Sequence, residues 1–167
     1  MLVNQSRSDK EERMTIMSNL SADQKHTICL DILHSLSSWF GNKAAVLDYA
    51  QQCRTLPVFA AFLEEEAIGF VALKSHNEFT SEICVMGVKP THHGQGVGRA
   101  LLVACEEICH ANGTRYLTVK TLADTHPSKS YAKTRAFYRA VGFLPLEIFP
   151  LYWDKDSPCL VMAKYLG

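Results

Sequence analysis

Neither sign of charge dominates this sequence of 167 residues, because 17 lysines and arginines balance 17 aspartates and glutamates. Proteins that bind nucleic acid or anionic membranes usually carry an excess of basic charge, so we expect neither as a partner. No apolar run approaches the ~20 residues that a membrane-spanning helix needs. The first residues also lack the apolar stretch of a signal peptide. These absences predict a soluble, cytoplasmic protein.

The sequence also lacks cysteines at metal-binding spacing. None of the six cysteines forms a CxxC pair, and no histidine or cysteine pair completes a ligand set. Most of them lie inside apolar segments. We therefore expect reduced, buried thiols and no bound metal, as is usual in the cytosol.

Repeats and low-complexity linkers are absent as well. A chain of this length, with 47% apolar and 20% charged residues, is typical of one folded domain with its own core. We expect that domain to span residues 1–167, with the polar residues 1–12 flexible.

The hydrophobic pattern changes its period along the chain. It predicts helices over 21–36, 42–53, 97–112 and 128–142, with Ser21 and Asn42 as N-terminal caps. Extended segments are expected over 13–19, 56–75 as a hairpin around Glu64–Glu66, 80–90, 114–122, 143–149 and 158–166. In the third helix, Leu101, Ala104, Cys105 and Ile108 form the apolar face. This order predicts an α/β (α+β) fold, in which helices flank a mixed, mostly antiparallel sheet.

Three alternating glycines, Gly94, Gly96 and Gly98, precede the third expected helix. Unpaired N–H groups at a helix start bind anions, and glycine lets a phosphate approach the backbone. The P-loop pattern GxxxxGK[ST] is absent. The dinucleotide pattern GxGxxG fails because Arg99 stands at its third glycine position. A nucleotide-binding protein therefore remains a weaker alternative, as does a purely structural turn.

The stretch His93-Gly94-Gln95-Gly96-Val97-Gly98 resembles the pyrophosphate loop Q/R-x-x-G-x-G/A of the GNAT superfamily of acetyl-CoA-dependent N-acetyltransferases, with His93 replacing the usual Gln or Arg. Upstream, SEICVMGVKP resembles the fourth strand of that family, and downstream RAFYRAVGF resembles its fourth helix. The order of elements is similar over residues 13–166. The longer pattern VKTL…YAKTRAFYRAVGF…PC is similar to a bacterial group of members.

The resemblance implies how acetyl-CoA would be held. The pyrophosphate would lie against the loop formed by His93, Gly94, Gln95, Gly96, Val97, Gly98 and Arg99. The pantetheine arm would bond to the backbone of Met86, Gly87 and Val88, if the strand diverges from its neighbour there. Gly87 could instead be a bulge residue. Tyr131 stands where the family often has a cofactor-contacting asparagine.

The resemblance also implies two catalytic residues. Tyr138 matches the tyrosine at the acetyl sulfur, although it could be a core aromatic residue like Phe137. Proton transfer from a phenol to a CoA thiolate is uphill by ~1.5 pKa units, so either collapse of the intermediate drives the transfer or Tyr138 mainly donates a hydrogen bond. Glu82 matches a catalytic glutamate, but it lies about 13 Å along the strand from Met86. It would therefore act through water, and the alternative is a surface glutamate.

Several other residues suit the edges of such a site. His92 and His93 could lie near phosphates, and Lys133 and Arg135 could reach the phosphate end of CoA or lie on a solvated face. On the acceptor side, aromatic and acidic residues stand in expected connections, where they could bind an amine, cover the core or form a turn: Trp39, Phe40, Tyr152, Trp153, Asp154 and Asp156.

The resemblance therefore predicts an N-acetyltransferase in which an amine attacks acetyl-CoA directly in a ternary complex. The partners would be acetyl-CoA and an amine acceptor, which the sequence does not identify. A homodimer is common in the family, but nothing in the sequence specifies an interface. The alternative function is a non-catalytic acyl-CoA-binding or sensor module.

Overall fold

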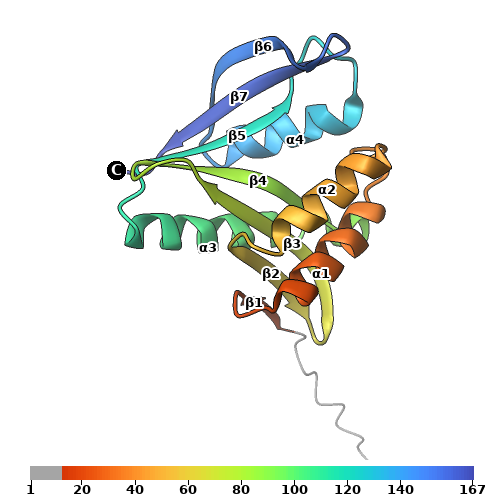
Figure 1. Ribbon diagram of the computed structural model, residues 1–167, viewed down its shortest axis with the longest axis vertical. Coiled ribbons are helices and arrows are strands. Elements are labelled where there is room, and N and C mark those ends of the chain that lie inside the picture. The colour runs from red at the N-terminus through yellow and green to blue at the C-terminus, as the bar shows by residue number, and fades with distance from the viewer. Residues whose placement is uncertain (1–12) are drawn as a thin grey trace, which may run out of the picture.

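A computed structural model describes residues 13–167 of the protein (Figure 1). Residues 1–12, which we expected to be flexible, lie outside the described part. The elements follow in the order β1 (Met14–Met17), α1 (Ala22–His34), α2 (Lys43–Cys53), β2 (Val58–Leu63), β3 (Glu66–Ser75), β4 (Thr80–Val88), η1 (Pro90–His92), α3 (Val97–Ala111), β5 (Tyr116–Leu122), α4 (Lys129–Ala140), β6 (Leu144–Asp154) and β7 (Ser157–Tyr165).

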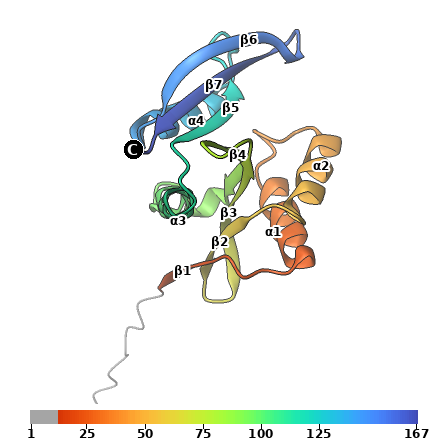
Figure 2. The ribbon, with the colours of Figure 1, turned by 60° about the vertical axis from the view of Figure 1, so that its left-hand side comes forward.

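The seven strands form one sheet in the order β1–β2–β3–β4–β5–β7–β6. Only β4 and β5 pair in parallel, and all other neighbours are antiparallel. Helices α1 and α2 cover one face, whereas α3 and α4 lie on the other (Figure 2). This arrangement confirms the predicted mixed, mostly antiparallel sheet with flanking helices.

Alternating side chains of the strands build a separate core on each face. Ala61 and Val71 point toward α3 and belong to the same core as Leu101 and Cys105 of that helix. Their neighbours Ala60 and Phe70 point toward α1 and α2. Because successive residues of a strand face opposite sides, runs such as VFAAF can be apolar throughout and still be buried.

Two of the helices begin at the predicted caps. The Ser21 hydroxyl accepts a hydrogen bond from the Gln24 N–H, and the Gln24 side chain accepts one from the Ser21 N–H, which completes a capping box. Asn42 accepts from the Ala45 N–H at 3.1 Å. These bonds satisfy backbone groups that a helix start leaves unpaired.

The face of α3 differs in part from the prediction. Leu101 and Cys105 are buried as expected, but Ile108 is 37% exposed. Leu102 and Cys109, each one residue beyond a predicted position, are also buried. In the last turn of α3, Cys109 rather than Ile108 therefore faces the core, about 100° around the helix axis, a difference that helical spacing alone does not resolve.

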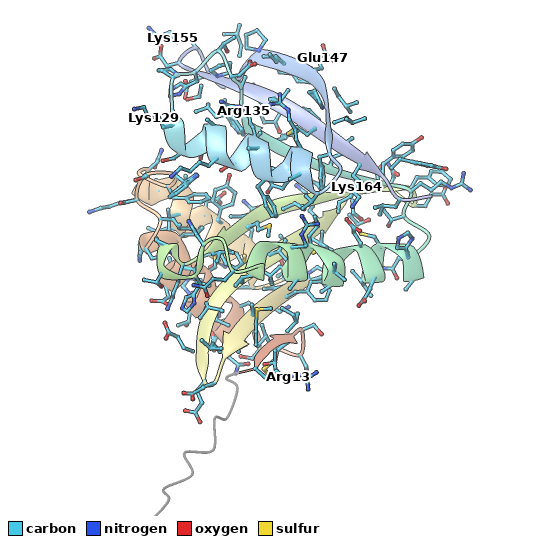
Figure 3. All side chains as sticks on the ribbon, turned by 180° about the vertical axis from the view of Figure 1, so that it is seen from behind. Arg13, Lys129, Arg135, Glu147, Lys155 and Lys164 are labelled. Atoms are coloured by element: carbon cyan, nitrogen blue, oxygen red, sulfur yellow. The ribbon has the colours of Figure 1, made fainter. Side chains whose placement is uncertain are left out.

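Strand β6 is longer than predicted. We expected it to end at Phe149 and a connection to follow over 150–157, but it reaches Asp154, and only Lys155 and Asp156 form the turn (Figure 3). Its pairing with β7 is interrupted between Phe149 and Asp154. An edge strand tolerates Pro145 and Pro150 because it has no neighbour on its outer side.

Strands β4 and β5 diverge after four paired residues. Their pairing runs from Thr80↔Tyr116 to Ile83↔Val119 and then stops, although both strands continue. On its other side, β4 pairs with β3 as far as Val88. The second half of β4 therefore keeps one edge free of sheet partners, as the resemblance predicted.

All six cysteines carry free thiols, with Cys84 half-buried and the other five buried. Among residues 13–167, no three potential metal ligands gather in one place. Within the same residues, no helix combines the length and apolar character needed to cross a membrane.

Candidate active site

The glycine loop connects the free end of β4 to the start of α3. Gly94 and Gly96 have φ angles of 72° and 81°, a left-handed conformation that other residues adopt only with strain. Gly96 is the N-cap of α3, and the first bond across this helix start runs from the Ala100 N–H to the Gly96 carbonyl. The amides before Ala100 have no intrahelical acceptor, so this helix start can bind an anion.

Gly98 serves a different purpose in the same loop. A Cβ atom at this position would lie 3.2 Å from two ring atoms of Phe137 on α4. The bare backbone of Gly98 therefore lets α4 pack directly on the first turn of α3. Two of the three glycines are needed for their backbone angles and the third for close packing.

A pocket of about 470 Å³ opens beside this loop. Its walls come from the second half of β4, the glycine loop, α4 and the connection between α1 and α2. Of the predicted cofactor residues, it is lined by Met86, Gly87, Val88, His93, Gly94, Gly96, Val97, Gly98, Arg99 and Tyr138, and Lys133 also lines it. The structure thus brings together two segments that are separate in sequence, the loop with β4 and the helix α4.

Two of the predicted cofactor residues lie elsewhere. Gln95 does not line this pocket, and its side-chain amide donates to the Thr91 carbonyl at 3.1 Å. Tyr131 lines a second pocket, and its hydroxyl donates to the Trp39 carbonyl at 2.9 Å. Both side chains make hydrogen bonds within the protein.

The absence of a side chain at Gly87 has a structural reason that the sequence did not reveal. It pairs regularly with Phe70, and the bulge in β4 lies at Cys84, between Ile83 and Val85. A Cβ atom on Gly87 would lie 2.9 Å from Leu36 Cδ1 and 3.1 Å from Ile32 Cγ2. The alternative of a bulge residue is therefore wrong, and the missing side chain makes room for α1.

His93 binds the end of β4. Its Nε2 donates to the Val88 carbonyl at 2.7 Å, and its ring meets the Trp39 ring edge-on at 5.7 Å between centroids. His92 also lines the pocket. The histidine that replaces the usual Gln or Arg thus connects the loop to β4 and to the α1–α2 connection.

Tyr138 stands where the two pockets meet. It lines both of them although it is only 5% exposed, and its ring lies edge-on to Phe137 and Phe143 at 5.3 Å each. Burial raises the pKa of its phenol above the ordinary value. Tyr138 is therefore a protonated hydrogen-bond donor throughout the physiological pH range.

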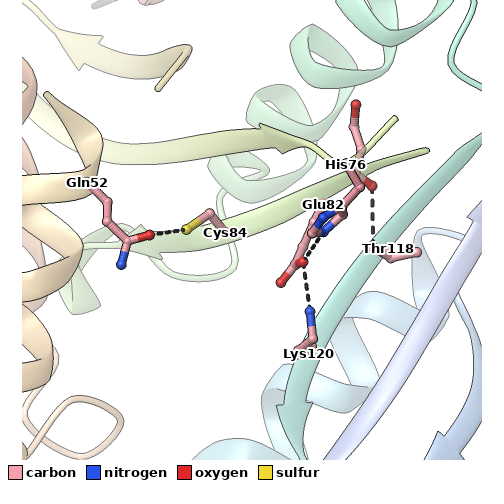
Figure 4. A network of polar contacts seen from close by, with 7 residues as sticks. Gln52, His76, Glu82, Cys84, Thr118 and Lys120 are labelled. Carbon is pink, nitrogen blue, oxygen red and sulfur yellow. Dashed lines mark hydrogen bonds and ion pairs between the residues drawn. The ribbon is translucent and has the colours of Figure 1, made fainter. Parts of the chain in front are cut away.

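Glu82 is a buried carboxylate, one of whose oxygens meets two nitrogen atoms, Lys120 Nζ and His76 Nε2 (Figure 4). It is 9% exposed and accepts a hydrogen bond from Lys120 Nζ at 2.7 Å. His76 Nε2 contacts the same carboxylate oxygen. The simple alternative of a solvated surface glutamate is wrong. Sequence reasoning missed His76 and Lys120, because neither has a sequence spacing that links it to Glu82.

Lys120 connects this cluster to the second pocket, whose wall it joins. Burial alone would lower the pKa of its ammonium, but the hydrogen bond and the charge attraction to Glu82 raise it overall. Its Nζ also lies 5.5 Å from the centre of the Tyr152 ring. Lys120 therefore stays charged, and Glu82 balances that charge.

Arg135 has a structural role. It is buried, and its guanidinium donates to the Leu122 carbonyl at 2.7 Å, which fastens α4 (Figure 3) to the end of β5. The two roles predicted for Arg135 were contact with a phosphate of CoA and exposure on a solvated face. Its buried position fits neither.

The second pocket, of about 420 Å³, lies on the other side of Tyr138. It is formed by the α1–α2 connection, α2, the diverging parts of β4 and β5, α4 and the tip of the β6–β7 hairpin. Trp39, Phe40, Met86, Thr134 and Tyr138 line both pockets. Trp153 and Asp154 line the second pocket from β6, and Asp154 Oδ1 also accepts from the Asp156 N–H in the hairpin turn.

The sequence model of the acetyltransferase (GNAT) family matches residues 29–143. A search of curated protein sequences finds no match.

Several solved structures share the fold. A GNAT-family protein from Desulfovibrio desulfuricans superposes with a TM-score of 0.77 at 16% identity, covering 93% of this chain and all of that one. The ribosomal-protein-S18-alanine N-acetyltransferase from Escherichia coli gives 0.72 at 19% identity, over 93% and 95% of the two chains. A GNAT-family acetyltransferase from Elizabethkingia anophelis with acetyl-CoA bound gives 0.70 at 18%, over 93% and 99%.

Proposed function

Because the chain belongs to the acetyltransferase (GNAT) family, whose members transfer acyl groups from acetyl-CoA, we propose that it acetylates a primary amine by direct attack in a ternary complex. The observation that carries the proposal is the position of Tyr138, which lines both pockets where they meet. One pocket then holds the co-substrate and the other holds the acceptor.

The first pocket suits acetyl-CoA in three respects. The start of α3 offers unpaired amides to the pyrophosphate, and Arg99 and Lys133 add positive charge in the same wall. The free edge of β4 from Met86 to Val88 can bond to the amides of the pantetheine arm. The carbonyl of Val88 already accepts from His93, so Met86 and Gly87 are the better candidates there.

The reaction removes two protons from the nitrogen. The ammonium loses the first, the free amine nitrogen bonds to the acetyl carbon, and the nitrogen loses the second to water as the carbon–sulfur bond breaks and CoA leaves as a thiolate. Glu82 is the proposed acceptor of the first proton, through water, because it does not itself line either pocket. His76 contacts its carboxylate and is half-exposed, which provides a route for the proton to solvent.

Tyr138 is assigned to the departing sulfur. Burial raises the pKa of its phenol, so full proton transfer to a thiolate is more unfavourable than for an exposed tyrosine. We therefore assign it the donation of a hydrogen bond to the sulfur as negative charge develops there. The thiolate acquires its proton from solvent on release.

Calorimetric titration with acetyl-CoA and CoA, with ATP and NAD as controls, tests the first pocket. We expect micromolar binding of the two CoA compounds only. Gly96→Ala should weaken that binding at least tenfold, because the added side chain strains the loop where it meets phosphate. Gly113→Ala is the matched control, since Gly113 also has a positive φ (75°), lies at the other end of α3 and does not line the pocket.

Release of CoA thiol in the presence of a panel of primary amines then tests the reaction. Acetylated amine, identified by mass spectrometry, supports the proposal. Tight CoA binding without turnover of any amine favours a non-catalytic acyl-CoA-binding module instead. Preference for ATP or NAD would contradict both.

A further inference from the structure

The second pocket is lined by several aromatic rings. Six of its wall residues are aromatic, and they come from the α1–α2 connection, α2, α4 and β6: Trp39, Phe40, Tyr49, Tyr131, Tyr138 and Trp153. The α1–α2 connection together with α2, the helix α4 and the strand β6 are far apart in sequence, and the fold brings them together around this cavity. Aromatic walls recognise flat apolar groups and attract ammonium ions to their faces.

Several polar atoms in the wall of this pocket bond within the protein. The Tyr131 hydroxyl donates to the Trp39 carbonyl, and the Trp39 indole N–H, at 3.0 Å from each, reaches the Ser130 carbonyl and the Thr134 hydroxyl. The Asn42 side chain accepts from the Ala45 N–H. The hydroxyl of Thr121 in the same wall is buried and has no hydrogen-bond partner among the described residues, so a ligand meets ring faces together with this one polar group.

The charges of the wall nearly cancel. Of the described residues that line the pocket, only Lys120 and Asp154 are charged. Glu82, just outside the lining, is paired with Lys120. A molecule with several ammonium groups would find a single carboxylate in the wall, that of Asp154, to pair with them.

We propose that the acceptor is a primary amine on a short alkyl arm attached to one aromatic ring system, with the ring held in the second pocket and the amine directed toward Tyr138. This inference rests on the proposed acetyltransferase function and specifies its acceptor. It disfavours polyamines and aminoglycosides, whose several charges would meet a single carboxylate in the wall, and protein N-termini that carry no aromatic ring for the pocket to hold.

The first test compares 2-phenylethylamine with n-butylamine by initial rates of thiol release at saturating acetyl-CoA. Both carry one ammonium group, and only the first has a ring. We expect kcat/KM for 2-phenylethylamine to be at least about tenfold higher, from contacts with two or more rings. Spermidine, kanamycin and an alanine-starting hexapeptide should fall below it. Equal rates for the matched pair, or faster acetylation of any of these three, would overturn the assignment.

A pair of variants locates the effect in the pocket. Trp153 lies on the edge strand and is 43% exposed, so Trp153→Ala should leave the fold intact. The substitution should lower the ratio of kcat/KM for 2-phenylethylamine to kcat/KM for n-butylamine at least threefold. It should leave acetyl-CoA binding unchanged. Leu151→Ala, on the same strand at a 75% exposed residue outside both pockets, is the control and should leave the ratio unchanged. An unchanged ratio in Trp153→Ala would contradict the proposal.

Failure of the acetyltransferase function can be told apart from failure of this inference. If acetyl-CoA binds but no amine reacts, calorimetric titration of 2-phenylethylamine into the CoA-saturated protein decides the pocket's preference. Binding at least tenfold tighter than that of n-butylamine supports an aromatic-amine site, and equal or absent binding overturns it. If another amine class reacts best, the proposed function stands and this inference is wrong.

Discussion

The phenolic hydroxyl of Tyr131 on α4 donates a hydrogen bond of 2.9 Å to the backbone carbonyl of Trp39 in the α1–α2 connection. The Trp39 indole reaches back to Thr134 on α4 at 3.0 Å. These bonds join α4 to the α1–α2 connection beside Trp39 and Thr134, two of the residues that line both pockets. The position of Trp39, and with it the boundary between the pockets, thus depends on α4.

Replacing Tyr131 with phenylalanine removes the first of these bonds and keeps the ring. We expect the free energy of unfolding to fall by about 1 kcal/mol and KM for the acceptor to rise several-fold. The dissociation constant of acetyl-CoA should change less than twofold in calorimetry. A tenfold loss of acetyl-CoA affinity would instead indicate that Tyr131 contacts the cofactor.

Tyr138→Phe should lower kcat at least tenfold with little change in acetyl-CoA affinity. The ring keeps its edge-on contacts with Phe137 and Phe143, whereas the hydrogen bond to the leaving sulfur is lost. Steady-state kinetics and calorimetry on the same preparation measure the two quantities. Unchanged turnover would return Tyr138 to a packing role.

Glu82→Gln tests the proposed path of the proton. The amide can still accept a hydrogen bond from Lys120 but cannot take a proton from the amine, so kcat should fall by about 10²-fold and its pH dependence should change. Glu66→Gln is the control, because Glu66 pairs with Lys89 away from both pockets. A pH–rate profile that overlays that of the parent would remove Glu82 from the mechanism.

Gly87→Ala should destabilise the fold by about 1–3 kcal/mol, since its Cβ would press on the buried side chains of Leu36 and Ile32. Gly41→Ala is the matched control, because its nearest neighbour, the Ser37 carbonyl oxygen, lies 3.6 Å away. Urea unfolding of both variants measures the difference. Equal stability would mean that α1 shifts without cost.

Stability should decline in alkaline solution. Burial raises the pKa of Tyr49 from 10.0 to about 12. The unfolded chain therefore loses this proton at a lower pH than the native protein, and the free energy of unfolding falls as pH rises from 10 to 12, by about 3 kcal/mol for this group. Tyr49→Phe should flatten the decline in urea unfolding. Tyr116→Phe, at a tyrosine 47% exposed, is the control and should leave it unchanged.

Much of the fold could be predicted because its signals are local. Ser21 and Asn42 each satisfy amides within three residues, and alternating apolar residues mark the strands. The glycine loop was recognisable because Gly94 and Gly96 need a backbone conformation that few other residues adopt. Prediction failed where exposure depends on a distant partner, as for Ile108 on α3 and the extension of β6.

The sequence by itself determined the element order, the family resemblance and the position of the glycine-rich helix start, because caps, periodicity and glycine angles act over a few residues. Only the tertiary structure decided that Gly87 makes room for α1, that Glu82 is paired with Lys120 and His76, and that six aromatic rings meet in a second pocket. Those relationships join residues up to 114 positions apart, Trp39 to Trp153, and depend on where β4 and β5 separate. No local pattern encodes that separation, because it arises from the packing of four helices against one twisted sheet.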